Sequence, residues 1–447
     1  MSRDLKSAVE RDPQSPVSVI IQTRSALTRN LISSLDNLNG IVHRRFESLR
    51  AVAVQLPAAA VTSLARRHDV DYISLDRTAI AAGHVETTTG ASIARNYNQL
   101  SSPGINGSGI GIAVLDSGID SSHASFRSGN STARVIASID FTGEGRTDDP
   151  YGHGTHVASL AAGSAQLANG EYTGIAPAAS IINVRVLDST GRGSMSTVIA
   201  GIEWCIQNRA AYNIRVLNLS LGTAPVDPFV SDPVCRAVRS AIDAGMVVCV
   251  AAGNLGKDSD GKKIYGAIHS PGIEPSAITV GAVNTFGTDS RSDDSIASYS
   301  SRGPTRGFYT DASGVRHYDN LIKPDLVAPG NRLIAAKSPN NLLVRKNPAL
   351  DASTNNDPAR GLMYLSGTSM ATPVAAGAAA LILQRNPALT PNLVKALLQY
   401  TAQPLAGFNT VEQGAGMLNV EGAIRLAALV RDDLSGRNHG DPLLISA

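Results

Sequence analysis

Aromatic residues and cysteines are both scarce in this chain of 447 residues. Phe, Trp and Tyr together make up 4% of the sequence, and the three cysteines are Cys205, Cys235 and Cys249. An odd number of cysteines without regular spacing excludes a disulfide-rich scaffold, and no Cys-x-x-Cys pair indicates a zinc or redox site. Cys249 lies in the apolar run "MVVCVAAGN", which is typical of a buried, unreactive thiol.

Long apolar runs and an excess of one charge are also lacking. No segment reaches the roughly twenty consecutive apolar residues of a membrane-spanning helix, so we expect no membrane partner. The first residues, "MSRDLKSAVERDPQSP", are polar and show no apolar core of a secretory signal. The formal net charge is +2 without a basic cluster, which argues against nucleic acid as a partner.

The chain does contain short apolar strands that alternate with helical runs, and these fall into two regions. The first region, Val17–Asp76, predicts the element order β-α-β-β-α-β, which is that of a small α+β ferredoxin-like domain. We assign residues 1–16 to a polar lead and residues 17–82 to this domain. Residues 83–105 are rich in Ala, Thr, Ser and Gly, and they predict an exposed, cleavable linker.

The second region, residues 106–430, predicts an α/β domain. Its apolar runs are continuous rather than alternating, which is typical of strands buried on both faces of a parallel sheet. Helical runs such as "TVIAGIEWCIQNRAAY" separate the strands, so the pattern is a βαβ series with helices on both sides of the sheet. The strands are expected in "GIGIAVLDSG", "ASIINVRVLD", "IRVLNLSLG", "GMVVCVAAGN" and "SAITVGAV". Residues 431–447 are expected to be a poorly ordered tail.

Polar groups stand at the ends of three predicted strands. Asp116 ends "IAVLDSG", Ser220–Gly222 follow "VLNL", and Asn254 ends "VVCVAAGN". Ligands of open α/β sheets bind beyond the carboxyl ends of the strands, although Asp or Asn beside Gly is also ordinary turn chemistry. The shared location favours a functional site at this edge.

Two histidines, His153 and His156, stand three residues apart in "YGHGTHVASLAAG". With Asp116 or Asp120 they could hold a metal ion, but the motif lacks the Glu and the spacing of HExxH. In the alternative interpretation, one ring does chemistry and the other is buried.

A serine at the start of a helix offers such chemistry. In "YLSGTSMATPVAAGAAALIL", a small-residue helix begins near Ser369, where backbone N–H groups and the helix dipole stabilise negative charge. Ser366, Thr368 and Ser369 are also ordinary helix N-cap residues. A serine nucleophile needs an imidazole base, and the base needs a carboxylate to orient it. The chain supplies these groups in the order Asp, His, Ser.

Four segments, "VLDSGID", "GHGTHVAS", "VAAGN" and "SGTSMATP", resemble the signature motifs of the subtilisin-like serine proteases. The resemblance spans roughly residues 106–425. It implies a three-layer subtilisin-like fold and a serine endopeptidase that acts through an acyl-enzyme. The N-terminal domain is similar to the inhibitory propeptides of this family, which implies a self-processing zymogen blocked by its own propeptide.

The resemblance also implies roles for individual residues. Asp116 resembles the carboxylate that orients the base, His153 the general base, Ser369 the nucleophile and Asn254 the side-chain donor of the oxyanion hole. Substrate-binding positions are implied for Ser220, Leu221 and Gly222 along the substrate backbone, and for Ala252 and Gly253 in the primary specificity pocket. His156 is then expected to face the packed interior. The chemistry implies no cofactor and no catalytic metal.

Other expectations are less direct. "GSAQLANGEYTG" lacks the Asn-rich pattern of the family's calcium loop, so no structural calcium ligands are assigned. Val374 and Ala124 replace a His and a Pro that the family usually has, and neither belongs to the triad.

Self-cleavage is expected between Ala79 and Thr89. Leu255 suggests a hydrophobic P1 preference. The family implies secretion, although no signal peptide is visible.

The alternative from the binding-protein class is a folded pseudoprotease that serves as a scaffold. All four catalytic positions carry the expected residue types, so the sequence lends this alternative no support.

Overall fold

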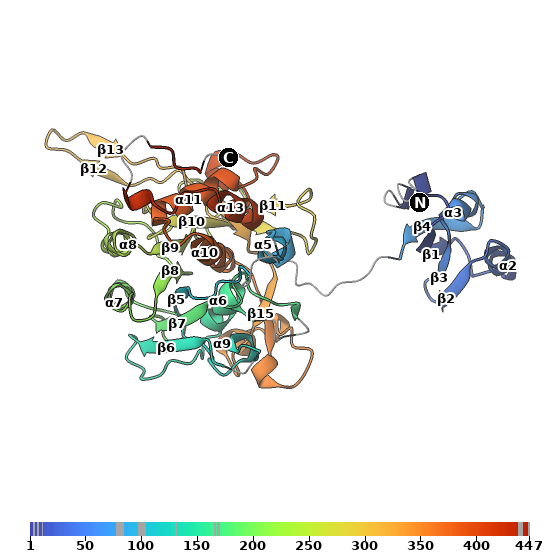
Figure 1. Ribbon diagram of the computed structural model, residues 1–447, viewed down its shortest axis with the longest axis horizontal. Coiled ribbons are helices and arrows are strands. Elements are labelled where there is room, and N and C mark those ends of the chain that lie inside the picture. Colours follow the sequence, from blue (N-terminus) through green and yellow to red (C-terminus); the bar gives the residue numbers. More distant parts are fainter. Residues whose placement is uncertain are drawn as a thin grey trace. The chain divides into compact units, whose positions relative to one another are not determined.

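The computed structural model divides the chain into two compact units, Met1–Ala81 and Ala82–Ala447 (Figure 1). No helix in the described part of the chain is long and apolar enough to cross a membrane. The structure describes residues 1–2, 5–6, 9–10, 12–76, 85–96, 104–129, 132–164, 167, 170–436 and 441–445.

The first unit confirms the predicted β-α-β-β-α-β order. Its described strands pair antiparallel in the order β2-β3-β1-β4. Alternate residues of one strand, such as Val19 and Ile21, are buried against Leu31 and Leu35 of the first helix. The elements are β1 (Pro16–Thr23), α2 (Arg29–Asn37), β2 (Ile41–Phe46), β3 (Ala51–Pro57), α3 (Ala58–Leu64) and β4 (Val70–Leu75).

The polar lead predicted for residues 1–16 is wrong in part. Leu5 is fully buried in the core of the first unit. The Ser2 backbone N–H donates to the Ile73 carbonyl at 2.9 Å. Leu5 and Val9 form an i, i+4 apolar pair among mostly polar residues, and such a pair is too short a pattern to predict a buried helix face.

The second unit is built on a mostly parallel sheet. Among the described strand pairs of this sheet, only β10–β11 is antiparallel. In the described part of the chain the strand order is β11-β10-β9-β8-β5-β7-β6, with β14 also paired to β10. The five expected strands are β5 (Gly111–Asp116), β7 (Ser180–Arg185), β8 (Ile214–Leu219), β9 (Val247–Ala251) and β10 (Ile278–Asn284). The sheet also contains β6 (Val135–Asp140), β11 (Ser295–Ile296) and β14 (Leu326–Pro329).

Helices cover both faces of this sheet, as expected for three layers (Figure 1). Ala113 and Leu115 of β5 are buried toward α7 (Met195–Gln207) and α8 (Pro233–Asp243). Ile112 and Val114 of the same strand are buried in the other core, with α6 and α10. The helices on that second face are α6 (His153–Ala162), α10 (Thr368–Arg385), α11 (Pro391–Thr401) and α13 (Val420–Ala427).

The two helices α6 and α10 approach each other closely at a glycine. A Cβ atom added to Gly377 of α10 would lie 2.7 Å from the carbonyl oxygen of Ala161 in α6 and 2.6 Å from Cβ of Ile175. Such distances are shorter than real Cβ contacts, so only glycine fits between the backbones here. The small-residue run after Ser369 therefore places α10 directly on α6.

The exposed linker predicted for residues 83–105 is wrong where the structure describes it. Residues 85–96 form α4 (Val85–Thr88) and α5 (Ala91–Asn96) of the second unit. Thr88, Thr89, Ala91 and Ala94 are at most 1% exposed. Small residues suit close helix packing as well as a flexible linker, so composition alone does not separate the two.

The predicted tail is also partly ordered. Val430 and Leu444 form an antiparallel bridge, and the Ile445 N–H donates to the Leu429 carbonyl at 2.8 Å.

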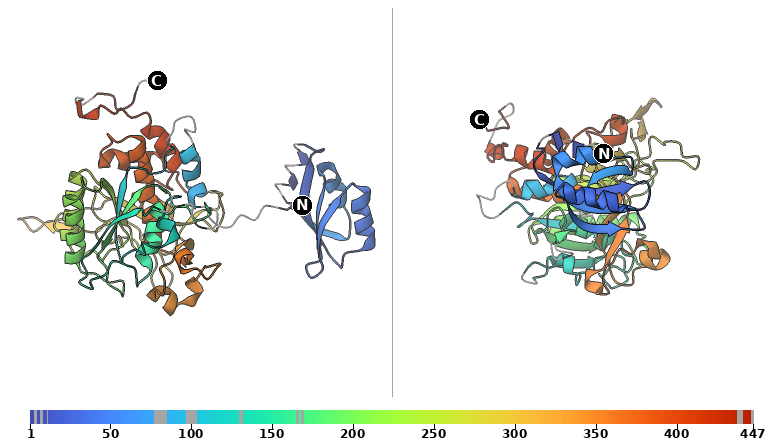
Figure 2. Two further views of the ribbon diagram at one scale, coloured as in Figure 1. Left: turned by 60° about the horizontal axis from the view of Figure 1, so that its bottom comes forward. Right: turned by 90° about the vertical axis from the view of Figure 1, so that its right-hand side faces the viewer.

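A two-stranded hairpin projects from the second unit (Figure 2). It consists of β12 (Phe308–Thr310) and β13 (Arg316–Tyr318), whose residues are all exposed. The remaining regular elements are β15 (Leu333–Ala336), α9 (Leu342–Lys346), β16 (Leu362–Leu365), α12 (Thr410–Gln413) and short 3-10 turns at Ala124–Phe126, Pro348–Leu350, Pro358–Arg360 and Leu434–Gly436.

Candidate active site

The structure brings the three predicted triad residues together at the carboxyl edge of the sheet. Asp116 is the last residue of β5, His153 the first of α6 and Ser369 the second of α10. His153 and Ser369 line one cavity of about 580 Å³, and Asp116 bonds to His153 from a position that is 1% exposed.

The Asp116 carboxylate orients and polarises the His153 ring. The Oδ1 atom of Asp116 lies 2.7 Å from Nδ1 of His153 and also accepts the Ser117 N–H at 2.8 Å. Burial lowers the pKa of His153, but the carboxylates of Asp116 and Asp149 outweigh it and hold that pKa above its ordinary value of 6.5. With Nδ1–H donated to Asp116, Nε2 is the nitrogen left to take a proton.

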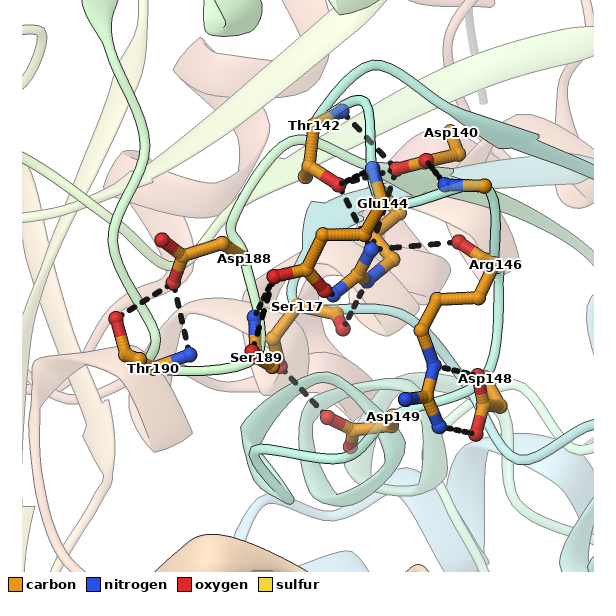
Figure 3. A network of polar contacts seen from close by, with 12 residues as sticks. Ser117, Asp140, Thr142, Glu144, Arg146, Asp148, Asp149, Asp188, Ser189 and Thr190 are labelled. Atoms are coloured by element: carbon orange, nitrogen blue, oxygen red, sulfur yellow. Dashed lines mark hydrogen bonds and ion pairs between the residues drawn. The ribbon is translucent and has the colours of Figure 1, made fainter.

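A buried carboxylate that the sequence analysis missed ties Asp116 to the start of α6. Asp149 is 2% exposed and accepts the Ser117 hydroxyl at 2.8 Å, as Figure 3 shows. It also accepts the backbone N–H groups of Gly152 at 2.7 Å and Thr155 at 2.8 Å. An Asp a few residues before a helix is a capping signal that could have indicated this role.

A buried arginine also binds the turn that follows Asp116. Arg185 of β7 is fully buried, and its guanidinium donates to the Ser117 carbonyl at 3.0 Å. It also donates to the Thr142 hydroxyl at 2.8 Å and pairs with Glu144 at 2.5 Å. The loop that carries Thr142 and Glu144 is thereby fixed beside Ser117 (Figure 3), and the turn after Asp116 is held from two sides.

Ser369 and Ser220 hold each other through two reciprocal hydrogen bonds. The Ser369 hydroxyl donates to the Ser220 carbonyl at 3.1 Å, and the Ser220 hydroxyl donates to the Ser369 carbonyl at 2.7 Å. Ser220 therefore contributes its side chain, whereas the sequence analysis assigned it only a backbone role. A serine hydroxyl rotates freely, and catalytic hydrogen bonds often form only with substrate bound.

Two hydrogen-bond donors face one small space beside Ser369. Thr368 donates its N–H at 2.9 Å and its hydroxyl at 3.1 Å to the Oδ1 atom of Asn254, so the amide nitrogen of Asn254 is turned away from Thr368. A Cβ atom added to Gly367 would lie 3.4 Å from that amide nitrogen and 3.6 Å from the Ser369 backbone nitrogen. Two donors arranged this way can stabilise an oxyanion between them.

Thr368 is a second residue whose role the sequence analysis missed. Its hydroxyl also accepts the Gly253 N–H at 3.1 Å, and the side chain is fully buried. Thr368 therefore fixes which way the Asn254 amide points. As an N-cap residue it looked ordinary, and only the spatial neighbour Asn254 reveals this function.

Not all of the predicted pocket residues line the cavity. Leu221, Gly222 and Gly253 do, but the Ala252 side chain is fully buried behind the wall, with Cys235, Ile268 and Ile273. Successive residues at a strand end point to opposite sides, so Ala252 faces the core while its neighbours face the cavity. Residues that line the cavity and were not predicted include Gly191, Arg192, Gly193, His269, Ser270 and Pro271.

Leu255 does not support a hydrophobic P1 preference. Its side chain is 50% exposed and is not among the residues that line the cavity. Leu255 follows Asn254 in the sequence but does not contribute to the cavity wall, so sequence position alone did not predict where its side chain lies.

His156 faces the interior, as predicted. The side chain is fully buried, and Nε2 lies 3.1 Å from the Leu333 carbonyl and 3.2 Å from the Met363 carbonyl. Burial lowers the pKa of His156 to about 3, so the ring is neutral and donates Nε2–H to these carbonyls. Among the described residues no group of three or more His, Cys, Asp or Glu has an arrangement that could hold a metal ion.

Replacing His156 by Ala is expected to destabilise the second unit by about 2–4 kcal/mol, because it leaves a cavity and two buried carbonyls without their donor. Chemical denaturation of the full chain, followed by tryptophan fluorescence, measures the change. His317, which is 45% exposed on the hairpin, is the matched control, and His317→Ala should lower stability by less than about 1 kcal/mol. Equal losses in both variants would contradict the interior role of His156.

Comparison with known proteins places this site in a family. The subtilase family model (peptidase S8) matches residues 107–422. The serine protease AprX of Bacillus subtilis (strain 168) is 36% identical over 397 residues, which cover 85% of this chain and 80% of that protein. Subtilisin E of the same strain is 33% identical over 411 residues, or 90% and 88% of the two chains. A cold-adapted subtilisin-like serine proteinase of known structure shares 31% identity over 70% of this chain and 88% of its own, with a TM-score of 0.48. This chain belongs to the subtilase family and is a serine endopeptidase.

Proposed function

We propose that the endopeptidase acts through Asp116, His153 and Ser369, with Asn254 as the side-chain donor of its oxyanion hole. The observation that carries this proposal is the 2.7 Å contact between Asp116 and the ring of His153, together with the cavity that His153 and Ser369 both line. Protein or peptide chains are the substrates. The residues supply a base, a nucleophile and two donors, so the proposed chemistry needs no cofactor.

The proposed reaction starts with proton transfer from the Ser369 hydroxyl to Nε2 of His153 as the Oγ atom attacks the scissile carbonyl carbon. The carbonyl oxygen becomes an oxyanion held by the Asn254 amide and the Ser369 N–H. Asp116 stabilises the imidazolium that forms. His153 then protonates the amine as the C–N bond breaks. In the second half, His153 takes a proton from water as the water oxygen attacks the acyl carbon, and it returns the proton to the Ser369 Oγ atom as the acyl C–O bond breaks.

We further propose that the chain is a zymogen whose first unit, Met1–Ala81, is an inhibitory propeptide. The antiparallel β2-β3-β1-β4 sheet of that unit supports a domain that folds separately from the protease. Residues 79–84 of the expected cleavage window lie outside the described residues. Thr88 and Thr89 are buried in the second unit, and a protease needs an accessible, extendable segment. The proposed cleavage therefore lies before Val85.

Active-site labelling combined with intact mass tests both parts of the proposal. A fluorophosphonate probe should modify Ser369, and the purified protein should have lost a fragment that ends before Val85. The Ser369→Ala variant should remain unlabelled and full-length. A probe attached elsewhere would contradict the assignment of Ser369, and the same clip in Ser369→Ala would contradict self-processing.

The activity should fall in acid because the base must be neutral. Since Asp116 and Asp149 hold the pKa of His153 above 6.5, kcat/KM should decline as the pH drops through a value above 6.5. In Asp116→Asn the stabilising charge is lost, so burial dominates and the acid limb should move to lower pH, with kcat reduced about ten-thousandfold. Rates measured from about pH 4 to 9 with a P1-alanine peptide test this. A profile that stays flat toward pH 4 would argue against a histidine base.

A further inference from the structure

A second imidazole lies in the same cavity as Ser369. His269 lines the cavity and fits between two glycines that border it. A Cβ atom on Gly253 would lie 2.7 Å from both Cγ and Cδ2 of the His269 ring. A Cβ atom on Gly222 would lie 3.1 Å from Cβ of His269 and 3.6 Å from its Nδ1 atom. The ring therefore lies against both glycine-bearing segments, at the floor of the gap between them.

The P1 side chain of a substrate would enter this gap. In the proposed function the P1 carbonyl oxygen lies between the Asn254 amide and the Ser369 N–H, and the P1 Cα atom is bonded to that carbonyl. Gly253 directly precedes Asn254, so a side chain that leaves this Cα passes the glycines and meets His269. Because both glycines lack a Cβ atom, the His269 ring can lie directly against them at the end of this path.

Backbone hydrogen bonds hold His269 in this position. Its N–H donates to the Ala252 carbonyl at 3.0 Å. The next residue, Ser270, pairs with Thr223 through two backbone hydrogen bonds of 2.9 and 3.0 Å. The floor of the gap is thus attached to the 220–223 segment on one side and to the 251–254 segment on the other.

The charges around His269 leave a place for an anion. The described residues that line the cavity include no Asp or Glu, and their basic groups are His153, His269 and the exposed Arg192. The Nε2 atom of His269 is buried without a hydrogen-bond partner among the described residues. Burial lowers the pKa of His269.

The charged groups on neighbouring elements are already engaged. Asp232, which caps α8, accepts the Ser270 hydroxyl at 2.7 Å and the N–H groups of Val234 and Cys235 at 2.9 Å. Arg302, whose carbonyl accepts the Ala267 N–H, pairs with Glu412 at 3.1 Å. Neither group supplies His269 with a free counter-charge.

We propose that His269 determines the P1 preference of this protease by accepting an acidic P1 side chain, such as glutamate, against its protonated ring. The proposal rests on the proposed function, because it needs Ser369 and Asn254 to place the P1 residue. A carboxylate that enters the cavity supplies the missing counter-charge and favours the charged form of the ring. The kcat/KM for cleavage after glutamate should therefore rise, relative to that for cleavage after glutamine, as the pH falls.

Two peptides that differ only in a P1 Glu or a P1 Gln provide the measurement. The ratio of their kcat/KM values removes the titration of His153, because both substrates use the same base. The ratio of Glu to Gln should rise about tenfold as the pH falls from about 8 to 6, well above the ordinary pKa of the glutamate itself. A ratio that stays constant over this range while both peptides are cleaved would overturn the proposal.

Variants separate His269 from other causes of pH dependence. In His269→Gln the ratio should lose its pH dependence, and in His269→Lys it should stay high toward about pH 9, because lysine keeps its charge there. The matched control His317→Gln, on the exposed hairpin, should keep the wild-type rise. The same rise in His269→Gln would overturn the proposal. Failure of the proposed function looks different, since neither peptide would then be cleaved in a Ser369-dependent manner.

Discussion

Replacing His153 by Ala is expected to lower kcat about a million-fold, the magnitude known for the base of subtilisin, a member of the same family. Without the imidazole nothing takes the proton of the Ser369 hydroxyl, and the residual rate comes from binding and from the oxyanion donors. The fold should persist, because the His153 side chain is 17% exposed at the edge of the cavity and fills no core position. Peptide hydrolysis and far-ultraviolet circular dichroism together measure the two effects.

His156→Ala is the matched control for this result. The two histidines share a helix, yet His156 is fully buried and its ring contacts the carbonyls of Leu333 and Met363. Below its lowered unfolding midpoint, His156→Ala should retain kcat within about tenfold. A His153→Ala enzyme with more than about one percent of the wild-type kcat would remove His153 from the role of base.

Replacing Gly367 by Ala is expected to lower kcat about a hundred- to a thousandfold with a smaller change in KM. The new methyl group would occupy the space 3.4 Å from the Asn254 amide nitrogen and 3.6 Å from the Ser369 nitrogen, where the oxyanion must form. The expected loss equals that of deleting one oxyanion donor, a magnitude measured in subtilisin. Steady-state kinetics on one peptide give both constants.

A second glycine separates the steric effect from backbone strain. Gly407 also has a positive φ, +83°, but a Cβ atom there would meet nothing within 4 Å. Gly407→Ala should therefore lose some stability and no kcat. In the double variant Gly367→Ala and Asn254→Ala, the second change should add little, because both remove the same stabilisation. Fully additive losses would place the methyl group outside the oxyanion site.

Much of the fold follows from local patterns. A continuous apolar run indicates a strand that is buried on both faces of a sheet. This holds for the five predicted strands β5, β7, β8, β9 and β10. The segments that were not predicted lack such a signal. Leu5 stands in a mostly polar stretch, with Val9 at helical spacing as an apolar partner there. Ala91 and Ala94 are small residues that occur in linkers and in packed helices alike.

The proposed site could be predicted where a residue would act through its own chemical type. Asp116, His153, Asn254 and Ser369 stand at strand or helix ends, and each carries a group that the proposed reaction needs. Asp149 and Thr368 act through neighbours that are distant in sequence, so no local pattern reveals them. Ala252 and Leu255 were assigned to the wall by position, whereas the direction of each side chain depends on how the strand leaves the sheet.

The contact between Gly377 and Ala161 has a consequence for how this enzyme can diversify. Ser369 and His153 each precede that contact by eight residues, or about 12 Å along a helix. The spacing of the proposed nucleophile and base is thus set by a helix contact in the protein interior. Arg192 and His269, which line the cavity, stand on separate loops outside these two helices. Substitutions in these loops can therefore change the substrate preference without changing the alignment of the reacting atoms.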